Sequence, residues 1–302
     1  MKVLITGSNG LLGQKLVNLL GTKPDVEVIA TSSGENRLPK NSVSYTFHSL
    51  DITDKKQVNE VMEKFGPDMV VNTAAMTNVD QCESDRQGCW DLNVHAVENL
   101  TEACAKQQSF LLHLSTDFIF DGEDGPYLED SKPNPISYYG ESKLASEKVV
   151  MESSIDWAIA RTILVYGISH QMSRSNIILW VKDSLENEKQ IRVVNDQWRT
   201  PTLAEDLAQG CYLIIKHRAH GIFNISGKDL LSPYQMATKT ADYFNLDKGL
   251  ITETDSQQFT QPAKRPPKTG FIIDKAQDLL GYDPHSFEEG IAILAKRLKQ
   301  KV

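Results

Sequence analysis

A tyrosine and a lysine lie four residues apart in the segment Tyr139-Gly140-Glu141-Ser142-Lys143. On a helix, this spacing places both side chains on one face. A phenol ordinarily titrates near pH ~10, and a nearby lysine cation lowers that pKa. Tyr139 is therefore a candidate proton donor to an oxygen that gains charge, and Lys143 is a candidate for tuning it. The same spacing also occurs as an ordinary surface pair, so position in the fold must separate the two interpretations.

Two hydroxyl residues, Ser115 and Thr116, follow the apolar run Phe110–Leu114, which is typical of a buried strand. Parallel sheets bind ligands at the carboxyl ends of their strands. We therefore expect Ser115 or Thr116 to hydrogen-bond a substrate carbonyl. The alternative is that these hydroxyls cap a loop.

Three glycines follow the first apolar run, in the stretch Thr6-Gly7-Ser8-Asn9-Gly10-Leu11-Leu12-Gly13. Glycines permit a tight turn and let backbone N–H groups approach a pyrophosphate at the start of a helix, where the helix dipole favours negative charge. The stretch from Gly7 to Gly13 is therefore the predicted binding site of a dinucleotide. The alternative is a glycine-rich turn without a ligand.

The end of the second predicted strand bears on the choice between NADP and NAD. An Asp or Glu that would hold the adenosine ribose is absent there, and the sequence reads Thr31-Ser32-Ser33. Ser32 and the downstream Arg37 can both donate to a 2′-phosphate. The sequence therefore favours NADP and leaves NAD open. A solvated loop position explains Arg37 equally well.

Two further segments are candidates for contact with this cofactor. Asp51, followed by Ile52, comes after the third predicted strand, where a carboxylate can accept from the adenine amino group. The alternative for Asp51 is the N-cap of a helix that begins near Asp54, although Thr53 is the better placed of the two for that role. Thr73, Ala74 and Ala75 end the fourth strand and leave space for the middle of the cofactor, but simple packing also explains the alanines.

The elements that position these candidate site residues are predicted from the pattern of the chain, in which short apolar runs alternate with segments whose apolar residues recur at helical spacing. The predicted strands include Val3–Ile5, Val26–Ala30, Met69–Val71, Phe110–Leu114 and Trp157–Ala160, and the predicted helices include Leu11–Leu20 and Asp54–Phe65. This alternation predicts an α/β fold with a Rossmann-type doubly wound parallel sheet of about six or more strands. The helix that carries Tyr139 should begin after Pro135 and run through Lys148.

The pattern loosens beyond Gly167, where an apolar helix is expected at Ile177–Leu185. We expect residues 1–166 to form an NAD(P)-binding Rossmann domain and residues 167–302 a smaller α/β C-terminal substrate-binding domain. The boundary is soft, because Gly221–Ser226 could return to the main sheet.

Composition excludes several classes of partner. The chain has 302 residues, of which 40% are hydrophobic, and a net charge of −8 that would repel a nucleic-acid backbone. Its four cysteines, Cys82, Cys89, Cys104 and Cys211, lack the spacing of a metal site and are expected to be reduced thiols. The first strand begins at once, and no apolar run approaches the ~18 residues of a membrane span. We therefore expect a cytoplasmic protein with no metal site and no membrane contact.

Taken together, the motifs resemble those of the dTDP-4-dehydrorhamnose reductase family, a branch of the extended short-chain dehydrogenases. The resemblance runs almost from end to end and is carried by Asn72–Ala75, Ser115–Gly122, Tyr138–Lys143, Val165–Gly167, Val194–Gln197, Pro201-Thr202 and Arg265-Pro266. It implies NADPH-dependent reduction of the 4-keto group of a nucleotide-linked 6-deoxysugar.

The resemblance also implies roles for single residues. Thr116 would bind the carbonyl, Tyr139 would donate the proton, and Lys143 would bind the nicotinamide ribose and tune the pKa of Tyr139. Asp117 would support this catalytic group as a neighbour. Arg265 would clamp the substrate diphosphate, because a guanidinium suits phosphate geometry; a salt bridge between domains is the alternative.

Four residues at three places depart from the family pattern. Ile163-Leu164 stand where the family has a small residue and a tryptophan, Met76 stands where it often has tyrosine, and Arg199 adds a charge without an evident partner near the substrate side. These departures leave the sugar and the nucleotide base open.

Two other functions compete with this reductase. A nucleotide-sugar epimerase or dehydratase would use the same tyrosine and lysine, but a dehydratase needs an Asp-Glu pair where this chain has Asp117-Phe118. A non-catalytic NADP-binding protein is the second alternative, because one branch of the family resembles the regulatory subunit of methionine adenosyltransferase. The sequence is also compatible with a homodimer.

Overall fold

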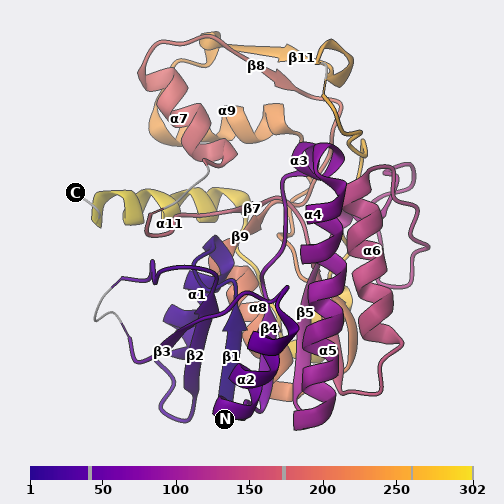
Figure 1. Cartoon of the computed structure of the whole chain (residues 1–302). Coiled ribbons are helices and arrows are strands. Elements are labelled where there is room, and N and C mark those ends of the chain that lie inside the picture. Colours follow the sequence, from indigo (N-terminus) through magenta and orange to yellow (C-terminus); the bar gives the residue numbers. More distant parts are fainter. Residues whose placement is uncertain (40–42, 172–174, 260, 301–302) are drawn as a thin grey trace.

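The computed structural model describes residues 1–39, 43–171, 175–259 and 261–300, and a seven-stranded sheet is its largest layer (Figure 1). The strands of this sheet are β1 (Lys2–Thr6), β2 (Glu27–Ser32), β3 (Thr46–Ser49), β4 (Met69–Asn72), β5 (Phe110–Thr116), β6 (Trp157–Thr162) and β10 (Gly221–Asn224). Their order is β10-β6-β5-β4-β1-β2-β3, and each neighbouring pair is parallel. The predicted doubly wound parallel sheet is confirmed. Its order reverses between β1 and β4, where such sheets open a crevice for ligands.

Helices cover both faces of the sheet and build a second lobe beyond its carboxyl edge. They are α1 (Leu11–Leu20), α2 (Lys55–Phe65), α3 (Val79–Ser84), α4 (Arg86–Trp90), α5 (Ala96–Gln107), α6 (Tyr138–Met151), α7 (Ile177–Glu186), α8 (Ala204–His217), α9 (Pro233–Phe244), α10 (Asp274–Leu280) and α11 (Phe287–Gln300). A π-helical turn, η1 (Asp91–His95), joins α4 to α5, and short 3₁₀ turns lie at η2 (Asp117–Ile119), η3 (Lys248–Leu250) and η4 (Ser256–Gln258).

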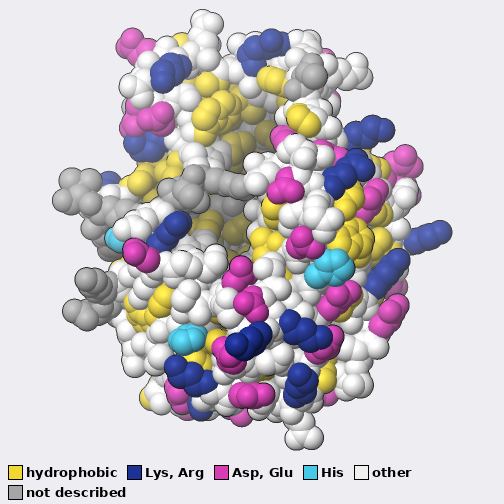
Figure 2. All heavy atoms as spheres, viewed as in Figure 1, with side chains coloured by type: hydrophobic (Ala, Val, Ile, Leu, Met, Phe, Trp, Pro, Cys, Tyr) yellow, Lys and Arg dark blue, Asp and Glu magenta, His cyan; other side chains and the backbone are white. Residues whose placement is uncertain are grey.

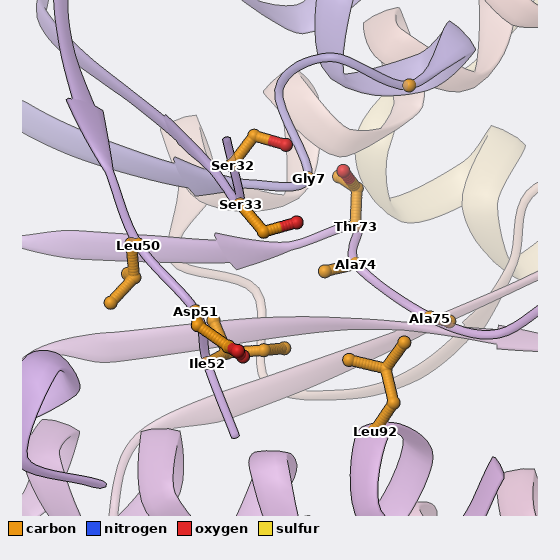
Figure 3. A pocket seen from close by; sticks show the side chains of 11 residues that line it. Gly7, Ser32, Ser33, Leu50, Asp51, Ile52, Thr73, Ala74, Ala75 and Leu92 are labelled. Carbon is orange, nitrogen blue, oxygen red and sulfur yellow. The ribbon is translucent and has the colours of Figure 1, made fainter. Parts of the chain in front are cut away.

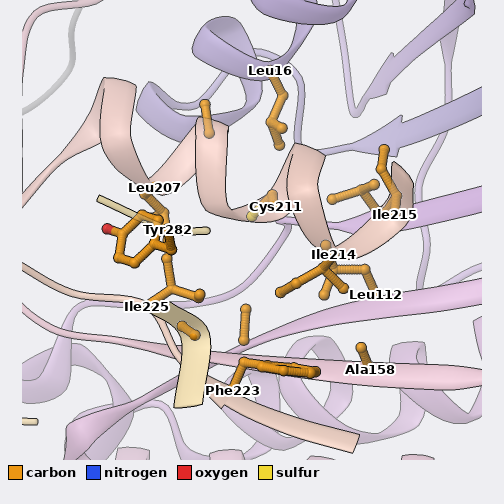
Figure 4. Close-up of a cluster of buried hydrophobic side chains, with 14 of the residues drawn as sticks. Leu16, Leu112, Ala158, Leu207, Cys211, Ile214, Ile215, Phe223, Ile225 and Tyr282 are labelled. Atoms are coloured by element: carbon orange, nitrogen blue, oxygen red, sulfur yellow. The ribbon is translucent and has the colours of Figure 1, made fainter. Parts of the chain in front are cut away.

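Two hydrophobic cores lie on opposite faces of the sheet, because successive strand residues point to opposite sides. Val3 and Ile5 of β1 belong to the core under α1 and α8, and Leu4 belongs to the core under α2 and α5. Figure 4 shows part of the first core, with Leu16 of α1 and Cys211 of α8 above the sheet. Strands buried on both faces need apolar residues throughout, which explains the continuous apolar runs in the sequence.

The ends of two predicted helices can be compared with the structure. Ser137 caps α6, its Oγ accepting from Gly140 N at 3.2 Å, so the helix begins close to the expected start after Pro135. The expectation that Thr53 caps α2 is wrong. Asp54 is the N-cap and accepts from two backbone N–H groups of the first turn, because it directly precedes the first helical residue.

A smaller lobe lies above the sheet in Figure 1 and contains α7, α9 and a two-stranded parallel sheet of β8 (Ile191–Val194) and β11 (Ile251–Thr254). A short parallel pair of β7 (Val165–Tyr166) and β9 (Thr202–Leu203) lies between the two lobes in this view. β10 pairs with β6, so the segment from Gly221 does return to the main sheet. The chain crosses between the lobes several times, and the proposed boundary after residue 166 remains a prediction.

Within the part of the chain that the structure describes, no helix combines the length and the apolar character needed to cross a membrane. The four cysteines are buried free thiols. Among the same residues, no group of three or more His, Cys, Asp or Glu side chains could hold a metal ion.

Candidate active site

A pocket of about 260 Å³ lies at the carboxyl edge of the sheet, where the turns after β1 to β4 converge (Figure 3). It is lined by Gly7, Gly10, Ser32, Ser33, Leu50, Asp51, Ile52, Thr73, Ala74, Ala75 and Leu92. Half of the residues that the sequence predicted for cofactor contact therefore meet in this pocket: Gly7, Gly10, Ser32, Asp51, Ile52, Thr73, Ala74 and Ala75. The pocket lies at the reversal of strand order, which is the usual site of a dinucleotide in this fold.

The glycine turn packs too closely for a side chain at Gly7 or Gly13. Gly7 has a φ of +64°, and a Cβ there would lie 2.8 Å from the backbone nitrogen of Ala74. A Cβ at Gly13 would lie 2.4 Å from the Gly7 carbonyl oxygen. Helix α1 then begins at Leu11 without a side-chain cap, so its first N–H groups are available to an anion. This cradle fits the pyrophosphate of a dinucleotide.

Three other residues predicted to contact the cofactor, Ser8, Asn9 and Arg37, do not line the pocket. Asn9 donates to the Glu35 carbonyl and accepts from the Arg37 backbone N–H, so its side chain braces the loop after β2. Arg37 is exposed and does not line the pocket. The Ser8 hydroxyl is buried without a hydrogen-bond partner among the described residues. Their contact with a cofactor remains a prediction.

Asp51 lines the pocket with an exposed carboxylate. One of its oxygens accepts from the backbone N–H of Thr53 at 2.9 Å and from the Thr53 hydroxyl at 2.7 Å. Asp51 is therefore not the cap of α2, and its position leaves the predicted contact with adenine open to test.

The predicted catalytic residues come together at the ends of β5 and α6. The buried hydroxyl of Tyr139 is hydrogen-bonded to Thr116. Burial raises the pKa of Tyr139, and the hydrogen bond from Thr116 opposes this rise. The expected lowering of the pKa is thus reversed in this structure, because removal from water disfavours the phenolate. Burial therefore favours the protonated phenol, which is the form that a proton donor needs.

Lys143 lies in the same buried region, and its Nζ is 2.7 Å from the Leu114 carbonyl oxygen and 3.0 Å from Nε2 of His113. Burial lowers the pKa of Lys143 to about 8, and the Glu147 carboxylate opposes this fall. Both members of the tyrosine–lysine pair are therefore inside the protein, and the surface-pair interpretation is wrong.

Asp117 holds Thr116, the candidate catalytic threonine. Its Oδ1 accepts from the Thr116 hydroxyl at 3.0 Å, and its Oδ2 accepts from the Thr269 hydroxyl at 2.5 Å. Thr116 also caps η2, accepting from Phe118 N at 3.3 Å. The loop-capping alternative is therefore observed for Thr116, together with its contact to Tyr139. The Ser115 hydroxyl is buried and has no partner among the described residues.

Arg199 is not the unpaired charge that the sequence suggested. Its guanidinium is buried, with Nε 3.7 Å from Asp117 Oδ2, and it donates to the carbonyls of Trp198, Pro266 and Pro267. Burial lowers the pKa of Arg199, and the Asp117 carboxylate opposes this effect. The partners could not be found from the sequence, because Asp117 and Pro266 lie in distant segments.

Arg265 forms the salt bridge that the sequence analysis kept as an alternative. Its Nη2 donates to Asp80 Oδ2 at 2.7 Å, and its Nη1 donates to Asp80 Oδ1 at 3.2 Å. About a fifth of the Arg265 side chain is exposed. To bind a substrate diphosphate, the Arg265 guanidinium would have to donate to the diphosphate and Asp80 together, or break its salt bridge with Asp80.

The departures from the family pattern lie around this site. Leu164 is 43% exposed and adopts a φ of +40°. Met76 packs with the cluster of Tyr139, Cys82 and Cys89. Figure 2 shows that the surface is hollowed between the lobes and that hydrophobic side chains line the hollow.

Sequence reasoning missed several buried polar residues that support the site. His113 of β5 contacts Lys143, and Asn93 of the π-helical turn donates to Ser142 Oγ at 3.0 Å. Asn93 also exchanges hydrogen bonds with the backbone of Met76. A polar residue inside the apolar run Phe110–Leu114 was the available signal for His113. Nothing local marked Asn93.

The fold and this site define the class of the protein: it is a dinucleotide-dependent oxidoreductase of the short-chain dehydrogenase/reductase type. Within this class, the chain belongs to the family described as RmlD substrate binding domain, whose model matches residues 1–300.

Named relatives and solved structures agree with this assignment. The chain is 30% identical over 296 residues to a probable low-salt glycan biosynthesis reductase of Haloferax volcanii, covering 97% of each chain. It is 31% identical to methionine adenosyltransferase 2 subunit beta of Rattus norvegicus, covering 92% of this chain and 82% of the relative.

The structure resembles a dTDP-4-dehydrorhamnose reductase of Clostridium acetobutylicum, with a TM-score of 0.87, 30% identity and coverage of 99% and 100% of the two chains. It also resembles the enzyme of that name from Bacillus anthracis in complex with NADP, with a TM-score of 0.84, 27% identity and coverage of 98% and 99%.

Proposed function

We propose that this protein reduces the 4-keto group of a nucleotide-linked 6-deoxysugar with NADPH. The observation that carries the proposal is the buried group of Thr116, Tyr139 and Lys143 at the carboxyl end of β5, at the same edge of the sheet as the pocket that Gly7 and Gly10 line. The named reductases among the relatives and solved structures support the same chemistry.

The residues present fit NADP. The Gly7–Gly13 turn would receive the pyrophosphate on backbone N–H groups, and Ser32, which lines the pocket, would face the adenosine 2′-phosphate. Arg37 lies outside the pocket lining and would have to turn toward that phosphate to bind it. Among the described residues that line the pocket, none from the end of β2 is acidic and would repel that phosphate. When bound, the cofactor supplies the hydride, and Tyr139 gives its proton to the substrate oxygen.

Thr116 would help to hold the substrate oxygen. A hydroxyl has one hydrogen, and Thr116 directs it to Asp117 Oδ1 in this structure. The contact with Tyr139 lowers the pKa of the phenol, so it is one in which Thr116 donates, and the single hydrogen cannot serve Asp117 and Tyr139 at once. To donate to a substrate carbonyl, Thr116 must rotate away from Asp117. Asp117 therefore sets the direction of the catalytic hydroxyl.

The test is to follow the absorbance of NADPH and NADH with purified protein and dTDP-4-dehydrorhamnose made in situ, with Tyr139→Phe as the control. We expect NADPH oxidation that the substitution abolishes. Oxidation that persists in Tyr139→Phe would contradict the assigned proton donor. A panel of other nucleotide 4-keto-sugars would then define the sugar, since Leu164 and Met76 depart from the family pattern.

A non-catalytic role is the second candidate, because the methionine adenosyltransferase subunit is similarly related to this chain. A regulatory protein would bind NADP and leave its absorbance unchanged. The assembled Tyr139, Thr116 and Lys143 favour the reductase. A dehydratase is disfavoured because Asp117 is already hydrogen-bonded to Thr116 and Thr269 and is followed by Phe118.

We also propose that the protein works in the cytoplasm, which cell fractionation would test.

A further inference from the structure

A buried histidine, His113, lies directly behind the candidate catalytic lysine. Its Nε2 is 3.0 Å from Lys143 Nζ and 3.0 Å from Ser146 Oγ, and only 1% of the residue is exposed. The histidine belongs to β5 and the lysine to α6, so this contact joins the strand that carries Thr116 to the helix that carries Tyr139. The charge that Lys143 carries therefore depends on whether Nε2 of His113 bears a hydrogen and donates, or bears none and accepts.

Asn72 determines which imidazole nitrogen carries that hydrogen. The Asn72 side-chain oxygen accepts from the Thr6 hydroxyl at 2.6 Å and from Ala74 N at 3.3 Å. Because a backbone N–H can only donate, the oxygen of this amide must face Ala74. The Asn72 NH₂ group then points to His113 Nδ1, 3.2 Å away, and Nδ1 must accept. The single hydrogen of the neutral imidazole is therefore on Nε2.

A hydrogen on Nε2 faces both Ser146 and Lys143. Ser146 donates its own hydrogen to the Lys143 carbonyl at 2.7 Å, so its oxygen can accept from Nε2. A Lys143 ammonium group has no lone pair, so it and the His113 Nε2–H would be two donors facing each other. A neutral Lys143 amine has a lone pair and can accept from Nε2–H. The network from Thr6 through Asn72 to His113 thus favours the neutral form of Lys143.

We propose that His113 is a positioning residue. Its Nε2–H, held in place by Asn72, favours the amine form of Lys143. The reductase therefore loses activity as the pH rises through the slightly alkaline range. The proposal rests on the reductase function above. An ammonium near Tyr139 favours loss of the phenol proton to the substrate, and an amine does not. Loss of the Lys143 proton therefore removes the electrostatic help that proton donation needs.

Several other groups act on Lys143. From α6, the buried Glu147 raises the pKa of Lys143, although Glu147 is itself paired with Arg161 of β6 at 2.8 Å. From α4, Cys89 also raises it. Burial acts in the opposite direction and is the largest effect, which brings the pKa of Lys143 to about 8. The hydrogen-bond network acts in the same direction as burial.

The first test does not need turnover. Protein labelled with ¹⁵N-histidine, with the His113 signals assigned by comparison with His113→Gln, should show the Nε2–H form from pH 6 to 9, and its ring signals should shift with a midpoint of about 8 as Lys143 titrates. Lys143→Met should abolish this shift. An Nδ1–H form, or ring signals that do not respond to pH, would overturn the proposal whether or not the protein is a reductase.

The second test uses the pH profile of kcat/KM for NADPH-dependent reduction of dTDP-4-dehydrorhamnose. In His113→Gln, a side-chain oxygen can accept from the ammonium, so we expect the midpoint of the alkaline fall to rise by about one pH unit. Ser146→Ala is the matched control, because it removes the other partner of Nε2 and should leave the midpoint in place. A purely structural role would lower the stability of His113→Gln and leave its midpoint unchanged. Absence of reduction in the native protein would count against the proposed function, while the NMR result would stand separately.

Discussion

Arg199 Nε lies 3.7 Å from Asp117 Oδ2 inside the protein, and each side chain is less than one-tenth exposed. Asp117 also accepts a hydrogen bond from the Thr116 hydroxyl, whereas Arg199 donates to the carbonyls of Pro266 and Pro267. The pair therefore joins the catalytic turn after β5 to the segment that carries Arg265. The position of Thr116, the proposed catalytic threonine, depends on residues from the C-terminal half of the chain.

Replacing Arg199 should destabilise the protein strongly. In Arg199→Met, the buried Asp117 carboxylate loses its cation, and removal of one member of a buried ion pair costs roughly 3–5 kcal/mol. Urea unfolding would measure the loss. The double variant Arg199→Met/Asp117→Asn removes both charges and should recover part of the stability but not the activity. A single variant as stable as the native protein would show that the pair is not important for folding.

Stability should rise with pH through the range in which Lys143 titrates. The pKa of Lys143 is about 8 in the folded protein against an ordinary 10.5, so between these values the unfolded chain binds more protons. This one group should thus add stability from pH 8 upward, amounting to about 3 kcal/mol when complete. The measurement is urea unfolding of native protein and Lys143→Met at pH 7.5, 8.5 and 9.5 (roughly spanning the lower part of this range). Equal pH dependence in both proteins would contradict the prediction.

A side chain at Gly7 should abolish tight cofactor binding. In Gly7→Ala, the new Cβ would meet the backbone of Ala74, and the φ of +64° is strained for alanine. We expect NADPH affinity to fall about 10-fold or more, measured by titration calorimetry. Gly66→Ala is the control, because Gly66 also has a positive φ but no atom within 4 Å of its Cβ position. It should lose some stability and retain NADPH affinity.

An acidic residue at the end of β2 should reverse the cofactor preference. Ser32→Asp would place a carboxylate where the 2′-phosphate of NADPH is expected, and like charges at close range cost several kcal/mol. The preference for NADPH over NADH should fall about 100-fold in kcat/KM. Arg37→Ala tests the alternative that Arg37 is only solvated, in which case both cofactors would be used as before.

The role of Arg265 can be separated from its salt bridge. Loss of the partly exposed pair with Asp80 should cost about 1 kcal/mol in either Arg265→Ala or Asp80→Ala. If Arg265 also binds the substrate diphosphate, only Arg265→Ala should raise KM for the nucleotide sugar. Steady-state kinetics of the two variants would decide this, and equal KM values would leave Arg265 with the salt bridge alone.

Most of the main sheet and the cofactor turn were predictable from the sequence. The apolar runs and glycine spacing are local patterns, and each was found where expected, including the helix that carries Tyr139 and Lys143. The errors concerned hydrogen-bond and ion-pair partners, and the pKa of Tyr139, which burial raises. Thr53 was expected to cap α2, and Arg199 was expected to be unpaired, because neither the cap geometry nor the buried carbonyls near Arg199 can be read from spacing.

The sequence by itself determined the strand–turn–helix units and the four-residue spacing of Tyr139 and Lys143, because backbone geometry turns short spacings directly into shared faces and tight turns. Only the tertiary structure decided that Asn72 and His113 stand behind Lys143, that Arg199 and Thr269 hold Asp117, and that Asp80 pairs with Arg265. Each of these contacts joins different strands, helices or loops, and such contacts depend on the order of the strands and the path of the chain between lobes, which no local pattern encodes.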